Sequence, residues 1–510
     1  MFQNKYPIAY EVAQIISSGH TTTTNVRAVN SGDGAATMIT EDEDEVVPIL
    51  LLNGFGVGSF HQHRLMRQLL LLSWMLQHNN DAQCNNRQRH LEHDKQQPQE
   101  QQQQQQQQQK RPRRRQQLVI YGIDYLGQGD SWPITCNGDG TSEDELNLGY
   151  SADVWLDQLN DFINEVVLDS DSSSSSPGEE DLSATTTTKT STTTATSSSS
   201  TNKVHLIGNS VGGYLATILT HRHSHYVASL TLLNATPVWG LNLPGWDGRL
   251  PPPPLPKYVG GKLFEMIRDP NVINTYLQTA YVHPEAFDGT YEDCFYGPGG
   301  LKKEEEGGSE NENVALGVKI RACTEGKGGH AAFASILWSA PASEWKTTTE
   351  GRQSAMRVPV DFYSALQAVP VDVLLLFGAD DPWCTPAIAK RMHLTLSKRN
   401  DDVMTTNGND GHVSVSPAQR YISLENVGHC PNHEAPRSVA KVVLPWIRAS
   451  ETTANVDGKQ QSIRNNIPLV VQGGCEETQE PWGVVRAHEV SLDESQDLGM
   501  IDRIVSSMVG

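Results

Sequence analysis

The chain has 510 residues, of which 37% are hydrophobic, and its formal net charge is −21 at pH 7. This negative charge argues against nucleic acid as a partner, because phosphate backbones are bound by basic surfaces. Seven cysteines without C-x-x-C spacing indicate reduced thiols and no structural zinc, and no apolar run reaches the roughly 18–20 residues of a membrane helix.

Residues 1–235 are predicted to form the first half of an α/β core. Apolar runs of strand length recur in this part of the chain, at residues 6–12, 47–52, 118–124, 203–207 and 229–233. No signal peptide and no Ser/Arg-rich transit peptide precedes the first of them. We therefore expect a mature or truncated chain, or one that is not imported.

A glycine-rich loop follows the second predicted strand, with the sequence Asn-Gly-Phe-Gly-Val-Gly-Ser-Phe at residues 53–60. Such a loop makes a tight turn, and the same turn can aim backbone N–H groups at a developing oxyanion. We predict Phe55 as one oxyanion donor, with Gly56 as the next candidate. Val211, which follows the predicted nucleophile, is expected to be the second donor.

The stretch Gly208 to Gly212 fits the G-x-S-x-G pattern of a nucleophile elbow. The pattern alone is weak, since a glycine-rich loop can carry it by chance. Here a buried strand pattern at residues 203–207 precedes it and a helix pattern at residues 213–220 follows it. This context predicts Ser210 as a nucleophile.

Three insertions interrupt the predicted core. Two are of low complexity, at residues 77–117 and 169–202, and one is polar, at residues 399–419. The first contains a glutamine run followed by a basic run at residues 110–115, which we interpret as its solvated flank rather than as an import signal. Such segments bury too little apolar surface to offset the entropy of ordering. For that reason we expect them to be disordered and catalytically silent. Each also connects a helix to a strand, so we expect them to leave the sheet on the side opposite the active site.

Residues 236–358 leave the carboxyl end of a strand, so we expect them to form a helical cap over the active site. Asp269 and Pro270 are typical of a helix start, and an apolar stripe with helical spacing follows. For most apolar cap residues the simplest interpretation is packing against the core, but an apolar cap also disfavours a small charged substrate. We predict that the substrate is bound by Gly54 and Gly56 of the glycine-rich loop and by three cap residues, Trp239, Phe333 and Trp338.

The second half of the core is predicted at residues 359–450, and residues 451–510 are expected to be a peripheral extension. An apolar strand pattern at residues 370–377 ends beside Asp380 and Asp381. A second strand, at residues 420–424, leads into a loop with His429. The order serine, acid, histidine is that of the α/β-hydrolase fold. We therefore predict a mostly parallel sheet with helices on both faces and a helical cap between the sheet halves.

Several stretches resemble the pheophytinase family, plastid α/β-hydrolases that remove phytol from pheophytin. Residues 232–240, Leu-Leu-Asn-Ala-Thr-Pro-Val-Trp-Gly, are the most distinctive, whereas the elbow and the Gly-Phe-Gly loop are shared with related dephytylases and other plastid hydrolases. The family's nucleophile, acid and base fall on Ser210, Asp381 and His429, and a Gly-x-x-Asp-Pro-Trp pattern favours Asp381 over Asp380. The similar stretches are residues 51–61, 123–129, 208–214, 232–240, 330–336 and 428–436.

The resemblance implies a serine carboxylic-ester hydrolase that converts pheophytin to pheophorbide during chlorophyll breakdown in the chloroplast. It implies no cofactor and no metal, and it suggests the thylakoid surface or other chlorophyll-breakdown enzymes as partners. Two alternatives stay open. One is a hydrolase of chlorophyll or of other lipophilic esters, and the other is an inactive hydrolase fold that binds a ligand, which a complete triad disfavours.

Overall fold

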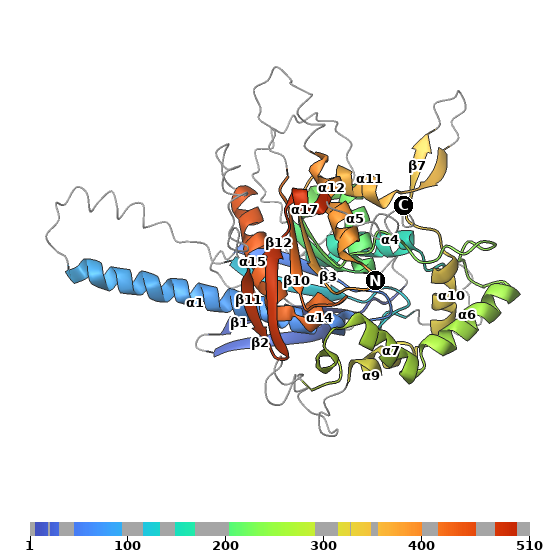
Figure 1. Ribbon diagram of the computed structural model, residues 1–510, viewed down its shortest axis with the longest axis horizontal. Helices are drawn as coiled ribbons and strands as arrows, with labels where there is room; N and C mark the ends of the chain where they lie inside the picture. Colours follow the sequence, from blue (N-terminus) through green and yellow to red (C-terminus); the bar gives the residue numbers. More distant parts are fainter. Residues whose placement is uncertain are drawn as a thin grey trace, which may run out of the picture.

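Ten strands form one sheet at the centre of the described chain (Figure 1). The structure is a computed structural model. It describes residues 6–18, 21–29, 45–93, 116–132, 148–168, 203–290, 315–326, 328–347, 355–399, 417–454 and 475–496.

The middle of the sheet is parallel, and both of its faces are covered. Its strands, in spatial order, are β4 (Gln116–Ile123), β3 (Glu45–Leu52), β5 (Val204–Asn209), β6 (Val227–Leu233), β9 (Asp372–Gly378) and β10 (Gln419–Glu425). Successive side chains of a strand point to opposite faces. Accordingly, Leu50 and Leu52 of β3 join one hydrophobic core, and Ile49 and Leu51 join the other.

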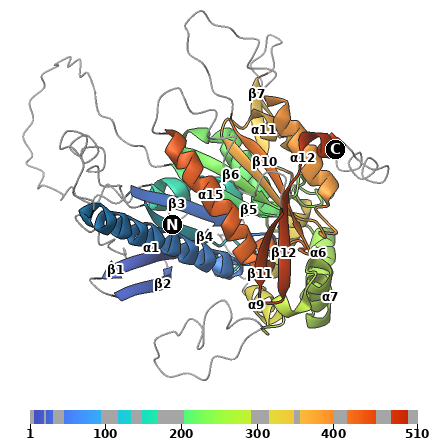
Figure 2. The ribbon, with the colours of Figure 1, turned by 60° about the vertical axis from the view of Figure 1, so that its left-hand side comes forward.

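Helices cover the two cores from opposite sides. On one face lie α4 (Ala152–Phe162), α5 (Val211–Arg222), α11 (Phe362–Ala368) and α12 (Pro386–Ser397). On the other face α1 (His63–His93) and α15 (Pro436–Ala454) lie side by side (Figure 2). The predicted α/β-hydrolase architecture, a mostly parallel sheet between helices, is confirmed. The short helices of the core are η1 (Ser59–Gln62), η2 (Ile163–Val167), η4 (Ser224–Tyr226), α14 (Pro431–Glu434) and α17 (Leu492–Gln496).

The cap lies between β6 and α11 in the chain. Its helix α7 begins as predicted, because the Asp269 side chain accepts a hydrogen bond of 2.9 Å from the Asn271 N–H. Of the predicted stripe, Ile273, Leu277 and Ala280 are buried, whereas Tyr276 is 52% exposed. The cap elements are α6 (Pro254–Ile267), α7 (Pro270–Ala280), η5 (Pro284–Ala286), α9 (Leu316–Cys323), α10 (Gly329–Trp338), β7 (Ser343–Thr347) and β8 (Ala355–Pro359).

Both edges of the sheet are antiparallel, and the sequence did not predict this. The first strand, expected at residues 6–12, is β1 (Tyr10–Ser18), and it pairs with β4 and with β2 (Thr21–Val29). Part of the expected peripheral extension instead forms β11 (Glu476–Glu480) and β12 (Gly483–Glu489), which continue the sheet from β10. The prediction was wrong for this hairpin because its strands are largely polar and give no apolar run.

The expected insertions fall mostly outside the described residues. The first was expected from residue 77, but α1 continues to His93. Residues 94–115, 169–202 and 400–416 are not described. The chain re-enters the sheet at the amino ends of β4, β5 and β10, opposite the carboxyl ends at which ligands bind in such sheets. Within the described ranges no helix combines the length and the apolar character needed to cross a membrane.

His393 gives the fold an expected acid sensitivity. This buried side chain of α12 has its Nδ1 2.9 Å from Ser495 Oγ of α17, and burial lowers its pKa from 6.5 to about 4. The unfolded chain therefore takes up a proton near pH 6.5, whereas the folded chain does not. From pH 7 to pH 5 this residue should remove about 2 kcal/mol of stability.

The test compares urea unfolding of the wild type and His393→Gln at both pH values. The wild type should lose more stability on acidification than the variant, even if the variant is less stable at pH 7. An equal loss in the two proteins would contradict the assignment.

Candidate active site

Ser210 occupies a strained turn between β5 and α5. Its backbone has φ 53° and ψ −119°, a region that non-glycine residues rarely adopt and that is stabilised only by the surrounding structure. Glycines allow the close approach this turn needs. A Cβ added at Gly208 would lie 2.4 Å from Gly212 O, and one added at Gly212 would lie 2.4 Å from Leu52 O. The geometry is that of a nucleophile elbow.

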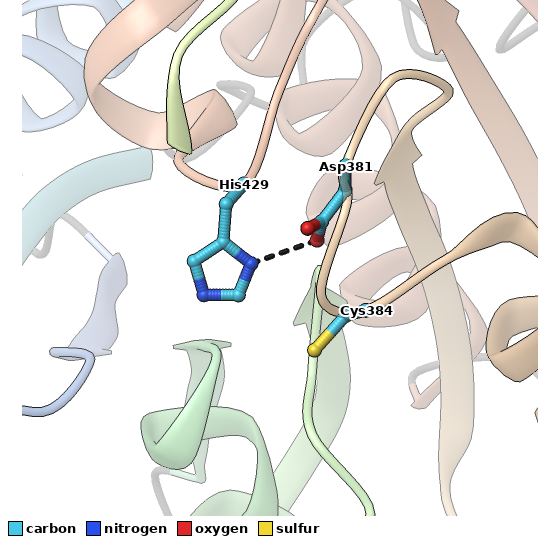
Figure 3. A group of neighbouring side chains, drawn as sticks. All are labelled: Asp381, Cys384 and His429. Atoms are coloured by element: carbon cyan, nitrogen blue, oxygen red, sulfur yellow. Dashed lines mark hydrogen bonds and ion pairs between the residues drawn. The ribbon is translucent and has the colours of Figure 1, made fainter. Parts of the chain in front are cut away.

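Asp381 and His429 form a buried acid–imidazole pair (Figure 3). His429 Nδ1 lies 2.7 Å from Asp381 Oδ2, and the Asp381 side chain is fully buried. The same carboxylate accepts hydrogen bonds from Asn234 Nδ2 at 2.7 Å and from the Trp383 N–H at 2.8 Å. These bonds fix the carboxylate so that it can orient the imidazole.

Asp381 is ionised in this setting. Burial has the largest single influence and would raise its pKa, but the hydrogen bond and charge of His429, with the bonds from Trp383 and Asn234, together bring the pKa below its ordinary value. A carboxylate that stays charged can stabilise a protonated imidazole. The arrangement therefore suits a histidine that gains and loses a proton.

The neighbouring Asp380 has a different environment. It is exposed, and its Oδ2 accepts a hydrogen bond of 3.0 Å from the Asn426 N–H. It therefore ties the end of β9 to the loop that follows β10, while Asp381 contacts His429.

The three predicted catalytic residues lie beyond the carboxyl ends of the parallel strands β5, β9 and β10. Asn209, the residue before Ser210, donates a hydrogen bond of 3.0 Å to the His429 carbonyl. In the part of the chain that the structure describes, Ser210 Oγ makes no hydrogen bond with His429. Such bonds are often long in unliganded sites and shorten when substrate binds.

The loop at residues 53–60 lies against the elbow. A Cβ added at Gly54 would lie 3.4 Å from Ser210 Cβ. The Gly56 N–H is already bonded to Gln128 Oε1 at 2.9 Å, which favours Phe55 over Gly56 as an oxyanion donor. Val211 is the first residue of α5, and N–H groups in a first helical turn have no acceptor within the helix.

Asp124, which was not among the predicted site residues, holds this loop in place. Its Oδ1 accepts a hydrogen bond of 2.6 Å from the Ser59 N–H, and its Oδ2 accepts one of 2.8 Å from the Asp130 N–H. Burial raises its pKa to about 6, and these two bonds counteract part of that rise. Asp124 lies in the stretch at residues 123–129 that resembles the pheophytinase family, but only the structure shows what its side chain contacts.

A small apolar cavity of about 60 Å³ lies between the loop, the turn after β4 and the cap. Of the residues predicted to bind substrate, Gly56 and Phe333 line it, and the Phe55 and Phe333 ring centroids are 6.2 Å apart. Its lining residues are Phe55, Gly56, Gly127, Gln128, Gly129, Trp132, Phe264, Ile267, Cys323, Thr324, Gly329, Ala332, Phe333 and Ile336.

Trp239 and Trp338 do not line this cavity. Trp239 is buried, its ring centroid lies 5.2 Å from that of Trp155, and its Nε1 donates to Ser339 Oγ at 3.1 Å. Trp338 is also buried, and its ring centroid lies 5.8 Å from that of Trp246. Their described contacts are packing contacts of the cap and the core.

Cys384 completes a group that could be mistaken for a metal centre. Ligand atoms of Asp381, Cys384 and His429 lie within 4.8 Å of one another (Figure 3). Metals are bound by the thiolate, but burial and then the charge of Asp381 raise the Cys384 pKa well above its usual range. The carboxylate and the imidazole are already bonded to each other, so the donor chemistry favours an acid–base pair.

Comparison with known proteins identifies the family of the chain. Residues 106–442, more than half of the chain, match the Alpha/beta hydrolase family. The chain is 25% identical over 374 residues to "Pheophytinase, chloroplastic" of Arabidopsis thaliana, which confirms the resemblance inferred from the motifs; the match covers 65% of this chain and 56% of that protein.

Two solved esterases are also similar, at low identity. The esterase of Thermogutta terrifontis is 15% identical, with 80% of this chain and 91% of that chain covered and a TM-score of 0.40. The Exiguobacterium antarcticum esterase is 14% identical, with 80% and 94% covered and a TM-score of 0.40. From the family match, the chain belongs to the Alpha/beta hydrolase family.

Proposed function

We propose that the protein is a serine carboxylic-ester hydrolase that removes phytol from pheophytin. The observation that carries the reaction class is the buried hydrogen bond of 2.7 Å between Asp381 and His429, beside the strained elbow of Ser210. The substrate is proposed from the similarity to the Arabidopsis pheophytinase.

In the proposed reaction His429 removes the Ser210 hydroxyl proton as Oγ attacks the ester carbonyl. Asp381 holds the imidazole through Nδ1 and stabilises the imidazolium that forms. The Phe55 and Val211 N–H groups bind the oxyanion. His429 then protonates the departing alcohol, and water repeats the sequence to release the acid.

The cap fits an apolar substrate. The cavity beside Phe55 is lined largely by apolar and aromatic side chains and glycines, so the alkyl chain of a lipophilic ester would be stabilised there by burial. Sites for drug-sized ligands are roughly 300–1,000 Å³, and this cavity is far smaller. This cavity can therefore hold only a small part of a macrocyclic substrate, such as a segment of its alkyl chain.

The proposed setting is the chloroplast, at the thylakoid surface or beside other enzymes of chlorophyll breakdown. The Arabidopsis relative is named as chloroplastic, and the lipophilic substrate proposed for this protein would reside in a membrane. Neither a metal nor a cofactor enters the proposed reaction.

The purified protein should convert pheophytin to pheophorbide and phytol, and should prefer it to short water-soluble esters. Burial of the alkyl chain is worth about 0.8 kcal/mol per methylene, and binding of this remote group can position the ester for attack. The assay presents pheophytin or chlorophyll in mild detergent and separates the products by chromatography.

Ser210→Ala is the blank in this assay. Cleavage of p-nitrophenyl butyrate with no phytol released from either pigment would replace the pigment proposal with a general lipophilic esterase. No labelling by a fluorophosphonate probe and no cleavage of any ester would instead favour an inactive binding protein.

A further inference from the structure

Glu434 is a fully buried carboxylate whose hydrogen bonds go to two different parts of the molecule. Its Oε2 accepts a bond of 2.7 Å from the Gly428 N–H, next to His429. Its Oε1 accepts bonds of 2.9 and 3.0 Å from the N–H groups of Val282 and His283, which follow the cap helix α7. One side chain therefore bridges the histidine loop and the cap.

A direct backbone contact adds to this bridge. The His429 N–H donates a hydrogen bond of 2.7 Å to the carbonyl of Ala280, the last residue of α7. Gly428 leaves no space between the two segments, since an added Cβ would lie 2.1 Å from Ala280 O. The backbone of the predicted base is thus held by the cap on one side and by Asn209 on the other.

The turn between β11 and β12 contacts Glu434. Trp482 lies in the turn that joins the two strands, and its Nε1 donates a hydrogen bond of 2.8 Å to the Glu434 carbonyl. The Trp482 ring also stacks on His283, with 3.7 Å between centroids. The cap segment and Glu434 are therefore held by the same tryptophan.

We propose that Glu434 is a positioning residue that makes the placement of His429 depend on the docked cap. The proposal rests on the proposed role of His429 as the base of a serine hydrolase. A movement of the cap that breaks the bonds at Val282, His283 and Ala280 would release the backbone at Gly428 and His429. Proton transfer from Ser210 would then be efficient only with the cap in place.

Glu434→Gln tests this role. The amide keeps the size of the side chain but places an NH₂ group or a weaker acceptor against the three N–H groups. We expect labelling of Ser210 by a fluorophosphonate probe to slow about 10- to 100-fold, because displacement of a catalytic group by about 1 Å can cost 10²-fold. For p-nitrophenyl butyrate, kcat should fall more than KM rises.

Glu480 provides a matched control. It is also a fully buried glutamate, and its Oε1 accepts bonds of 2.8 Å from both the N–H and the Oγ of Ser438, in α15. Its Oε2 has no hydrogen-bond partner among the described residues, so the glutamine in Glu480→Gln can keep both bonds through its amide oxygen. The same change of a buried glutamate to an amide should therefore leave labelling within about 3-fold of the wild type per folded molecule. Glu434→Asp, which keeps a carboxyl group, should be intermediate, and it replaces the amide variant if that variant does not fold.

The outcomes separate the two proposals. If the folded Glu434→Gln protein labels as fast as the wild type, or if both amide variants slow equally, the positioning role is overturned. If the wild type itself is not labelled, the proposed serine-hydrolase function has failed instead.

Discussion

Replacement of Ser210 by alanine should lower kcat roughly 10⁶-fold, because the nucleophile and its base act as one unit in serine hydrolases. His429→Ala should cost nearly as much, since without the base the Ser210 hydroxyl keeps its proton. Turnover of p-nitrophenyl butyrate and, separately, of pheophytin measures both effects.

The kcat of the Ser210→Ala/His429→Ala double variant gives this prediction its sharpest test. The double variant should be no slower than the slower single variant, because each change alone disables the unit. Circular dichroism and melting curves must show that all three proteins fold. Multiplicative losses in the double variant would show that Ser210 and His429 do not act as one unit. A folded Ser210→Ala protein with substantial activity would exclude Ser210 as the nucleophile.

Local patterns were sufficient to predict the parallel core. Runs such as residues 47–52 and 370–377 are continuous and apolar because both faces of a central strand are buried, and they correspond to β3 and β9. The order of Ser210, Asp381 and His429 then predicted which strand ends would meet. The edge strands β11 and β12 were missed because an edge can be built from polar residues.

The hydrogen bonds that hold the site could not be predicted from the sequence. Asn234 lies 147 residues from Asp381, yet it donates to that carboxylate and also accepts from the Gly378 N–H. Its only signal was its place in the distinctive stretch at residues 232–240. Glu434 gave a similar weak signal within residues 428–436. Such contacts depend on the packing of several elements, which no local pattern specifies.

Asp381→Asn should lower kcat about 10⁴-fold, because an amide at this position leaves His429 in the wrong tautomer. The carboxylate accepts hydrogen bonds from Asn234 and from the Trp383 N–H and is also paired with His429 Nδ1. The NH₂ group of an asparagine can only donate, so the amide cannot replace all three interactions. The effect should fall on kcat rather than on KM, since the carboxylate acts on the imidazole and not on the bound ester. Steady-state kinetics with p-nitrophenyl butyrate and with pheophytin measure it.

Asp380→Asn is the matched control, one residue away in the same turn. Its carboxylate is exposed and accepts only from the Asn426 N–H among the hydrogen bonds of the described residues, a bond that an asparagine Oδ1 can also accept. We expect activity within about 3-fold of the wild type, in keeping with the small energies of exposed polar contacts. A large loss in Asp380→Asn with a small one in Asp381→Asn would transfer the acid role to Asp380. Equal losses would indicate that the turn, and not one carboxylate, is what His429 requires.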